Sequence, residues 1–234
     1  HKLGVSPDRQ VLVSGRLWRD WPSLRYLCPE TAGLAVLPES GAWPQIPPSA
    51  RLMLVLWPFE DHSQALVRLP ANRLLSVQEG AQERGDLESE SRLLYVLVRS
   101  EPPDAVPQNA EASWQQGIHL VGYELAVVDD RLQVTLYWRC DQPLSRNYTV
   151  FCHLLDDGQM IAQHDGPPAL GYYSTGRWRP GDIVRDVHTI AMDTDSAPNQ
   201  LAIGWYYGET MEHLELVDAN GQPSGQTRLL LDLD

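Results

Sequence analysis

The sequence predicts a two-part fold, a small Rossmann-like α/β domain followed by an all-β sandwich of jelly-roll or immunoglobulin-like type. In the first hundred residues, short apolar runs alternate with segments that carry helix signals, which is typical of buried strands joined by helices. From residue 117 onward the apolar residues recur at every second position, which indicates strands with one buried face. A chain of 234 residues is long enough for two such cores.

The first half contains strand and helix candidates in alternation. Five apolar runs are the expected strands, at residues 11–15, 34–39, 52–57, 74–80 and 93–100. Pro22 suits the first turn of a helix that runs to about residue 28, and Asp61 with Gln64 resembles a capping box for a helix that Pro70 ends. The turn after the first strand has a single glycine and neither a GxGxxG nor a Walker pattern, so nucleotide binding is not predicted.

A linker is expected between the two halves. Residues 101–116 are rich in proline and alanine without periodicity, so we expect them to join an α/β domain of residues 1–100 to a sandwich of residues 117–234. Asp129-Asp130 and Asp157-Gly158 mark tight hairpin turns within the second half. Its expected strands are 118–127, 131–140, 148–155, 160–165, 183–192, 200–207, 213–217 and 227–233.

Composition excludes some classes of partner. A net charge of -13 argues against nucleic acid and anionic membrane surfaces, because both are bound through clustered cations. No apolar run approaches the roughly 18 residues that a membrane helix needs. The chain starts without an initiator Met and without a signal segment, so we expect it either to be a fragment of a longer protein or to begin with vector-derived residues.

The cysteines are expected to be core residues. If residues 141–147 join two paired strands, Cys140 faces Tyr148 and Cys152 faces Leu136. That register separates the two cysteines by roughly 14 Å along the strands. A disulfide needs Cα atoms within about 7 Å of each other. Cys28 has no motif partner.

The segment from His164 to Asp182 is the strongest candidate site. Aromatic rings can stack on sugar rings, and Asp, His and Arg side chains can hydrogen-bond to sugar hydroxyls. The hypothesis is a carbohydrate-binding site formed by Trp178, Tyr172, Tyr173, Arg177, His164 and Asp165. In the alternative interpretation, Trp178 plugs one end of the sandwich and the segment is structural.

Other constellations carry less information. His153 and His164 share a face if Asp157-Gly158 centres a two-residue turn, but no third ligand is fixed by spacing and no metal site is predicted. No catalytic residue is predicted, because the isolated serines give no GxSxG elbow. No cofactor is predicted either. Charged residues near the carboxyl ends of the first-half strands form a further candidate cleft. They are Arg16, Arg19, Glu39, Glu60, Asp61 and Glu79.

Four motifs of the second half carry a family resemblance. They are Leu136-Tyr137-Trp138, Tyr148-Thr149-Val150-Phe151 with His153-Leu154-Leu155-Asp156, Gln163 with Asp165-Gly166-Pro167, and Trp178 with Pro180-Gly181-Asp182. Residues 117–233 thereby resemble the C-terminal soluble region of bacterial family 39 glycosyltransferase-like proteins, which are multi-spanning membrane enzymes that use lipid-linked sugars. The first half of the chain resembles these proteins only in its position ahead of this region.

The resemblance implies a non-catalytic, extracytoplasmic accessory region, because the family's catalytic residues lie in membrane-embedded parts and adjacent loops that are absent here. Its expected partners are a glycan or the membrane-embedded region of the same polypeptide, and the parent would be a glycosyltransferase. The alternative is a structural or protein-interaction module with no sugar binding.

Overall fold

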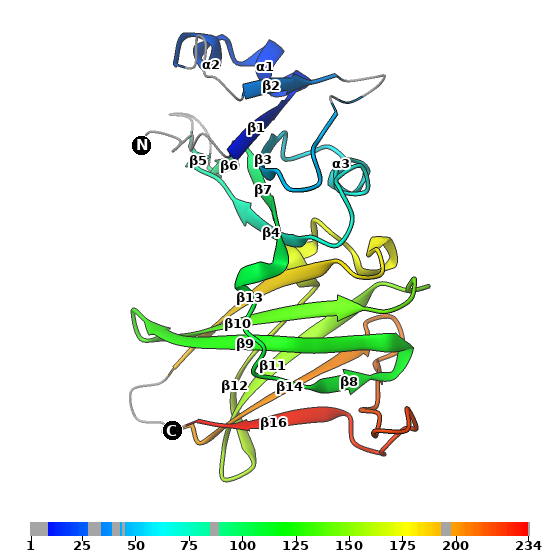
Figure 1. Cartoon of the computed structure of the whole chain (residues 1–234). Helices are drawn as coiled ribbons and strands as arrows, with labels where there is room; N and C mark the ends of the chain where they lie inside the picture. The colour runs from blue at the N-terminus through cyan, green and yellow to red at the C-terminus, as the bar shows by residue number, and fades with distance from the viewer. Residues whose placement is uncertain are drawn as a thin grey trace. The chain divides into compact units, whose positions relative to one another are not determined.

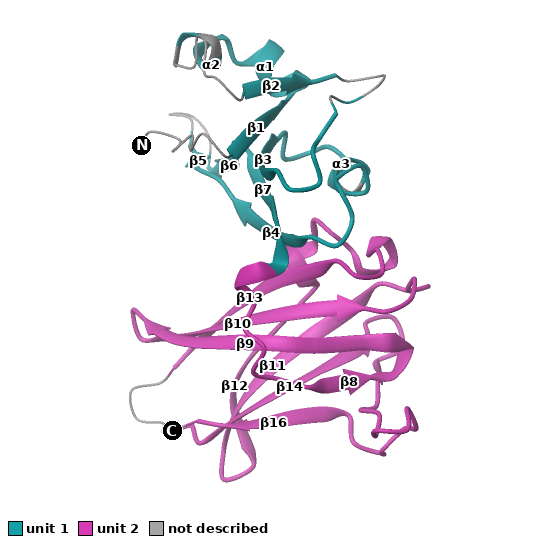
Figure 2. Ribbon diagram, in the orientation of Figure 1, with its two compact units in different colours: residues 1–103 teal, residues 104–234 magenta. Residues whose placement is uncertain are grey.

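The structure is a computed structural model that describes residues 9–27, 34–38, 43, 45–84, 89–192 and 198–233. The chain divides into two compact units, His1–Pro103 and Asp104–Asp234 (Figure 2). Strands predominate in the part of the chain that the structure describes, at 50%, against 13% for helices. Within the described ranges, no helix combines the length and the apolar character that crossing a membrane requires.

Unit 1 is built on a five-stranded mixed sheet. Its strands are β1 (Arg9–Ser14), β2 (Leu34–Leu37), β3 (Arg51–Leu56), β4 (Leu74–Glu79) and β7 (Val96–Glu101), with a separate ribbon of β5 (Gln82–Glu83) and β6 (Arg92–Leu93). The strand order is β2-β1-β3-β7-β4 (Figure 1). β1 runs parallel to β2 and β3, whereas β7 runs antiparallel to both β3 and β4.

The prediction of a Rossmann-like α/β domain is wrong. The helices of the described residues are short: α1 (Gly15–Asp20), α2 (Pro22–Leu27) and α3 (His62–Leu66). The antiparallel β7 also breaks the all-parallel order that alternating strands and helices predict. Continuous apolar runs such as those of β3 and β7 report burial and not strand direction, which explains the error.

Unit 2 consists of two antiparallel sheets. Its strands are β8 (Ala112–Trp114), β9 (Ile118–Val128), β10 (Arg131–Cys140), β11 (Tyr148–Asp156), β12 (Gln159–Gly166), β13 (Ile183–Ala191), β14 (Gln200–Tyr207), β15 (Glu212–His213) and β16 (Arg228–Asp232). One sheet has the order β13-β10-β9-β8. The other has the order β12-β11-β14, with β15 and β16 both pairing with β14.

Short 3-10 turns and one extra strand complete the chain. The turns are η1 (Pro103–Ala105), η2 (Gln115–Gly117), η3 (Pro168–Gly171) and η4 (Thr175–Arg177). β8 lies inside the segment predicted to be a linker and pairs with β9, so at least these residues belong to unit 2. The long strands of unit 2 begin and end within two residues of their predicted bounds, whereas β15 is shorter than predicted.

Four buried tryptophans hold the two sheets of unit 2 together. Trp138 of β10 contacts Trp205 of β14 edge-to-face, with ring centroids 4.7 Å apart. Trp114 packs on Trp138 at 5.6 Å, and Trp178 packs on Trp205 at 5.9 Å. All four side chains are at most 4% exposed. Because Trp138 and Trp205 come from different sheets, this contact shows that the sheets pack face to face.

The predicted pairing of β10 with β11 is wrong. β10 pairs with β9 and β13, and β11 pairs with β12 and β14, so residues 141–147 cross from one sheet to the other. The prediction for the cysteines is nevertheless confirmed, because Cys140 and Cys152 are free and fully buried. Burial raises the pKa of Cys140 to about 11. Cys28 lies outside the described residues.

The predicted register of the β11–β12 hairpin is also wrong, by one residue. A bulge between Leu154 and Leu155 shifts the pairing, so that His164 opposes Cys152 and not Phe151. A shift of one residue moves a side chain to the other face of a strand. His153 and His164 therefore lie on opposite faces of their sheet.

Candidate functional site

A pocket of about 680 Å³ opens at one end of unit 2, and we call it the end pocket. It lies where β9 begins, β10 ends, β11 begins and β14 ends, because antiparallel strands bring alternate connections to the same end. Its polar and aromatic walls include His119, Asp141, Arg146, Tyr148, Tyr207 and Glu212.

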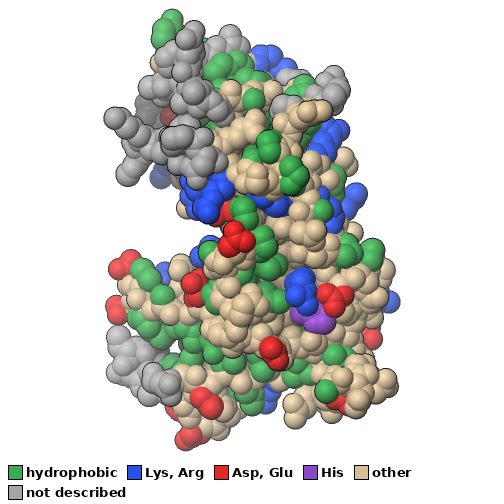
Figure 3. Space-filling view, in the orientation of Figure 1, with side chains coloured by type: hydrophobic (Ala, Val, Ile, Leu, Met, Phe, Trp, Pro, Cys, Tyr) green, Lys and Arg blue, Asp and Glu red, His purple; other side chains and the backbone are tan. Residues whose placement is uncertain are grey.

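His119 and Asp141 in one wall of the end pocket belong to a chain of polar contacts centred on His119. The Oγ of Ser113 on β8 lies 2.7 Å from His119 Nδ1, and the Oδ2 of Asp141 lies 2.7 Å from His119 Nε2. Arg139 Nε lies 3.3 Å from Asp141 Oδ1. Figure 3 shows one patch on this face where histidine, basic and acidic side chains lie side by side.

The His119 chain has the composition of a serine hydrolase triad without its geometry. Ser113 meets His119 as its direct cross-strand neighbour in the β8–β9 ladder. Asp141 is 56% exposed, and its short contact with His119 lacks hydrogen-bond alignment. In a serine hydrolase triad the carboxylate is aligned with the imidazole and orients it, which this carboxylate does not do. We interpret the chain as fixing the His119 ring in the pocket wall.

The opposite wall is formed by two tyrosines and an ion pair. The Arg146 guanidinium lies over the Tyr207 ring, 4.8 Å from its centroid, and Arg146 Nη1 lies 3.5 Å from Glu212 Oε2. The Tyr148 ring meets the Tyr207 ring edge-on at 6.2 Å. Burial raises the pKa of Tyr148, and the hydrogen bond to Glu209 raises the pKa of Tyr207. Both phenols are therefore neutral hydrogen-bonding groups at physiological pH.

Trp114 and Gln116 also line the end pocket. Trp114 is 1% exposed, and its indole Nε1 has no hydrogen-bond partner among the described residues. Gln116 has a φ of 67°, in the left-handed region that residues other than glycine rarely adopt. Such strained positions gather at ligand sites, where the surrounding structure maintains them.

The charged side chains of the end pocket each have an oppositely charged partner. Glu212 is matched by Arg146 within the lining, whereas Asp141 is matched by Arg139, which lies outside the lining. The lining therefore offers hydrogen-bonding groups together with charged groups that already have partners. Among the described residues, no cluster of His, Cys, Asp and Glu has the arrangement of a metal site.

The loop between β12 and β13 supports the end pocket from behind. Thr175 Oγ1 accepts a hydrogen bond from the Tyr148 amide at 2.9 Å and donates one to the Arg146 carbonyl at 2.9 Å. Asn147 Oδ1 accepts a bond from the Gly176 amide at 3.1 Å. Thr175 is fully buried, and its bond with the Tyr148 amide is shielded from water, whereas the Gly176–Asn147 bond is exposed. The loop thus positions two wall residues of the pocket without lining it.

The aromatic residues predicted to bind sugar lie mostly inside this loop. Tyr173 is fully buried and Trp178 is 4% exposed. The Trp178 indole Nε1 donates to the Tyr173 carbonyl at 3.0 Å. Stacking on a sugar requires a solvent-exposed ring face, which neither residue presents. Their packing matches the alternative interpretation, in which Trp178 plugs the end of the sandwich.

The other four predicted residues do not converge on one surface. Tyr172 is half-buried, and Arg177 is exposed in η4. His164 and Asp165 are adjacent on β12 and therefore face opposite sides of the sheet. Asp165 Oδ1 contacts His153 Nε2 at 3.1 Å, whereas His164 turns toward β13.

His164 is the half-buried end of a polar row whose other side chains, His188 and Asp186, are buried. Its Nδ1 lies 2.9 Å from His188 Nδ1, and His188 Nε2 lies 2.8 Å from Asp186 Oδ2. Asp186 Oδ1 accepts the Ala169 amide at 3.1 Å. Burial, and then the neighbouring His188, lowers the pKa of His164. This row joins β12 to β13 and to η3.

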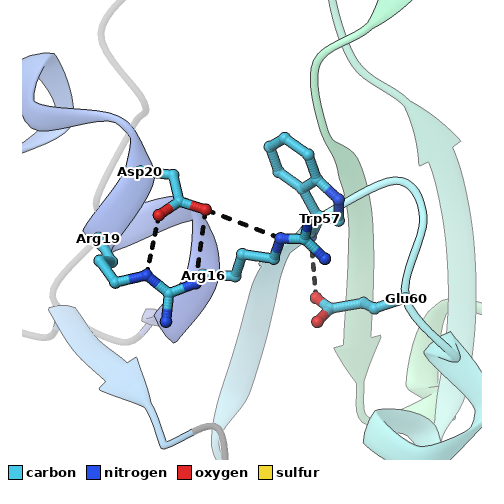
Figure 4. A network of polar contacts seen from close by, with 5 residues as sticks. All are labelled: Arg16, Arg19, Asp20, Trp57 and Glu60. Carbon is cyan, nitrogen blue, oxygen red and sulfur yellow. Dashed lines mark hydrogen bonds and ion pairs between the residues drawn. The ribbon is translucent and has the colours of Figure 1, made fainter.

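The charged residues of unit 1 form a separate network, shown in Figure 4. Asp20 pairs with Arg19 at 2.8 Å and with Arg16 at 3.7 Å. The Arg16 guanidinium lies 4.8 Å from the Trp57 ring centroid, and Glu60 Oε1 accepts the Trp57 amide at 2.9 Å. These contacts tie α1 to the segment after β3.

A smaller pocket of about 270 Å³ lies at the carboxyl ends of β1, β2 and β3. Of the predicted cleft residues, the pocket contains Glu60 and Asp61, and its lining does not include Arg16, Arg19 or Glu79. Glu39 lies outside the described residues.

Comparisons with known protein families, curated proteins and solved structures gave no match. The functional assignment therefore rests on the pocket itself. Sequence reasoning missed the end pocket, although its loops carry a signal. The connections 141–147 and 208–211 both join strands at the same end of an antiparallel fold, and both are flanked by tyrosine and charged residues.

Proposed function

We propose that unit 2 is a non-catalytic carbohydrate-binding module whose ligand occupies the end pocket. The observation that carries the proposal is the lining, in which the half-buried Tyr207 ring stands beside neutral hydrogen-bonding groups and beside charged groups that have oppositely charged partners. Neutral sugars combine apolar ring faces with many hydroxyl groups, so they suit such a lining. The volume of about 680 Å³ lies in the range of small-ligand sites.

A charged ligand suits the end pocket less well. Arg146 is stacked on Tyr207 and paired with Glu212, so an anion would have to compete with a carboxylate for it. The acidic residues are likewise matched by Arg139 and Arg146, which reduces attraction for a cation. The paired charges favour an uncharged, polyhydroxylated ligand.

The proposal extends to the setting of the chain. On the family resemblance of residues 117–233, the chain serves as an extracytoplasmic accessory region of a membrane glycosyltransferase-like protein. Presenting a glycan to the membrane-embedded part of the same polypeptide would be its role there. The burial of the aromatic loop favours a structural role for that loop. It does not argue against sugar binding by unit 2, because the proposed ligand site is the end pocket and not the loop.

A glycan array followed by calorimetric titration tests the binding function. We expect the wild-type chain to bind one class of neutral glycan and Tyr207→Ala to weaken that binding at least tenfold, or about 1.4 kcal/mol. Tyr206→Ala is the matched control, because Tyr206 directly precedes Tyr207 in β14 and faces the other side of the sheet.

Two results would contradict the proposal. Absence of glycan binding by the folded wild-type chain would exclude the module's carbohydrate function. Equal losses in Tyr207→Ala and Tyr206→Ala, with both variants folded by circular dichroism, would place the binding surface outside the end pocket.

A further inference from the structure

Two further depressions adjoin the end pocket. The first, of about 510 Å³, shares His119 and Val217 with the end pocket and extends along β8 and the start of β9. The second, of about 360 Å³, shares Ser145, Arg146 and Tyr207 and extends along the start of β11. Because the two sets of shared residues belong to different walls, the depressions flank the end pocket on different sides.

The first flank is rich in hydrogen-bonding groups. Ser113, Glu111 and Arg139 line it, and Glu111 is exposed. His119 forms the boundary with the end pocket, held by its contacts with Ser113 and Asp141. A ligand that extends from the end pocket into the first flank would contact the His119 imidazole, because His119 lines both depressions.

The second flank has a similar character. Asn147, Thr149 and Glu209 line it, and the stacked pair of Arg146 and Tyr207 forms its boundary with the end pocket. Glu209 hydrogen-bonds the Tyr207 side chain, which fixes the ring between the two spaces. Thr175 and Asn147 anchor the backbone of this boundary, so the division between the two depressions is preorganised.

Each of the three depressions is large enough for a small ligand on its own. A single sugar ring would leave two of them empty, whereas a linear chain of sugars would fill all three. Rings in adjacent subsites are already linked, so the later contacts avoid a second loss of translational freedom.

Resting on the proposed carbohydrate function, we propose that the three depressions form one groove with at least three subsites for a neutral, linear oligosaccharide. The end pocket is the central subsite, and His119 and Arg146 mark its two borders. The ligand class is thus a polysaccharide segment and not a free monosaccharide.

Calorimetric titration with ladders of one to six residues tests the groove, using cello-, manno-, xylo- and chito-oligosaccharides as probes. We expect the affinity for the matching ladder to rise roughly tenfold, about 1.4 kcal/mol, with each residue up to about three, and then to level off. Glu111→Ala and Thr149→Ala should each weaken the longest probe several-fold and leave the shortest bound probe unaffected. Tyr207→Ala should weaken every length. Gln163→Ala is the control, because Gln163 lies on β12 outside all three linings.

The groove and the binding function fail in different ways. Binding that is independent of chain length, with no effect of Glu111→Ala or Thr149→Ala, would overturn the groove and leave the end pocket as a single-sugar site. Absence of binding to every ladder and to the glycan array would overturn the carbohydrate function itself, and the groove with it.

Discussion

Replacing Trp178 with alanine measures whether the aromatic loop is a structural plug. Trp178 is 4% exposed, contacts the Trp205 ring and donates its indole hydrogen to the Tyr173 carbonyl at 3.0 Å. Truncating a buried tryptophan to alanine costs about 3–5 kcal/mol, from lost burial and the cavity left behind. The Tyr173 carbonyl also loses its partner, which adds about 1 kcal/mol or more.

The expected loss is a large share of total stability, because domains are stable by only about 5–15 kcal/mol. Urea unfolding followed by circular dichroism gives the free energy of unfolding for wild type and variant. Trp178→Phe keeps an aromatic ring but removes the hydrogen bond, so its free energy of unfolding should lie between those of wild type and Trp178→Ala. Arg177→Ala is the control from the same loop, because Arg177 is exposed.

The plug interpretation predicts a graded series, with Arg177→Ala close to wild type, Trp178→Phe intermediate and Trp178→Ala lowest. A loss below about 1 kcal/mol for Trp178→Ala, which is the size of an ordinary substitution, would refute the reasoning. The loop would then be loosely packed, and the ring faces of Tyr173 and Trp178 would be open to ligands.

Three further perturbations test the support of the pocket, the histidine row and the packing of the second sheet. Thr175→Val should lose its two hydrogen bonds to the pocket wall, lowering stability by about 1–3 kcal/mol and weakening oligosaccharide binding, and Thr175→Ser should restore both in urea unfolding and calorimetry. The lowered pKa of His164 means that the unfolded chain binds its proton more readily, so this contribution to stability is complete above pH 6.5 and is lost as the pH falls through 6.5 toward the folded-state pKa. Melting temperatures between pH 5 and pH 8 should therefore vary less in His164→Gln than in wild type, and an equal pH dependence would contradict the assignment. Gly204→Ala should cost about 1–3 kcal/mol by urea unfolding, because the new methyl group would collide with the Phe151 ring and lie 2.6 Å from the Thr227 carbonyl. Gly166→Ala in the same sheet meets only an ordinary contact at 3.6 Å, so a cost equal to that of Gly204→Ala would refute the steric explanation.

Much of the secondary structure of unit 2 was predictable. Alternation of apolar and polar residues gave the long strands nearly to the residue, because one buried face imposes a period of two on the sequence. The burial of Cys140 and Cys152 also follows from their places in such runs. The local pattern indicates which side chains are buried, and it is the same whichever strand pairs with the segment.

Strand partners and direction were not predictable in the same way. The apolar runs of unit 1 look alike whether a neighbour is parallel or antiparallel, so the antiparallel β7 could not be distinguished from a parallel strand. The bulge at Leu154 moved His164 to the face opposite His153, although the Asp157-Gly158 turn was placed correctly.

The sequence by itself determined where strands form in unit 2 and which of their residues are buried. The reason is that a strand with one buried face has apolar residues at every second position. Only the tertiary structure decided which surface could bind a ligand. Tyr207, Arg146 and His119 are far apart in the chain and form one pocket because antiparallel strands return their ends to the same place. Trp178 and Tyr173, adjacent to that pocket in the fold, turn inward because their rings fill the core and the indole finds its hydrogen-bond partner there.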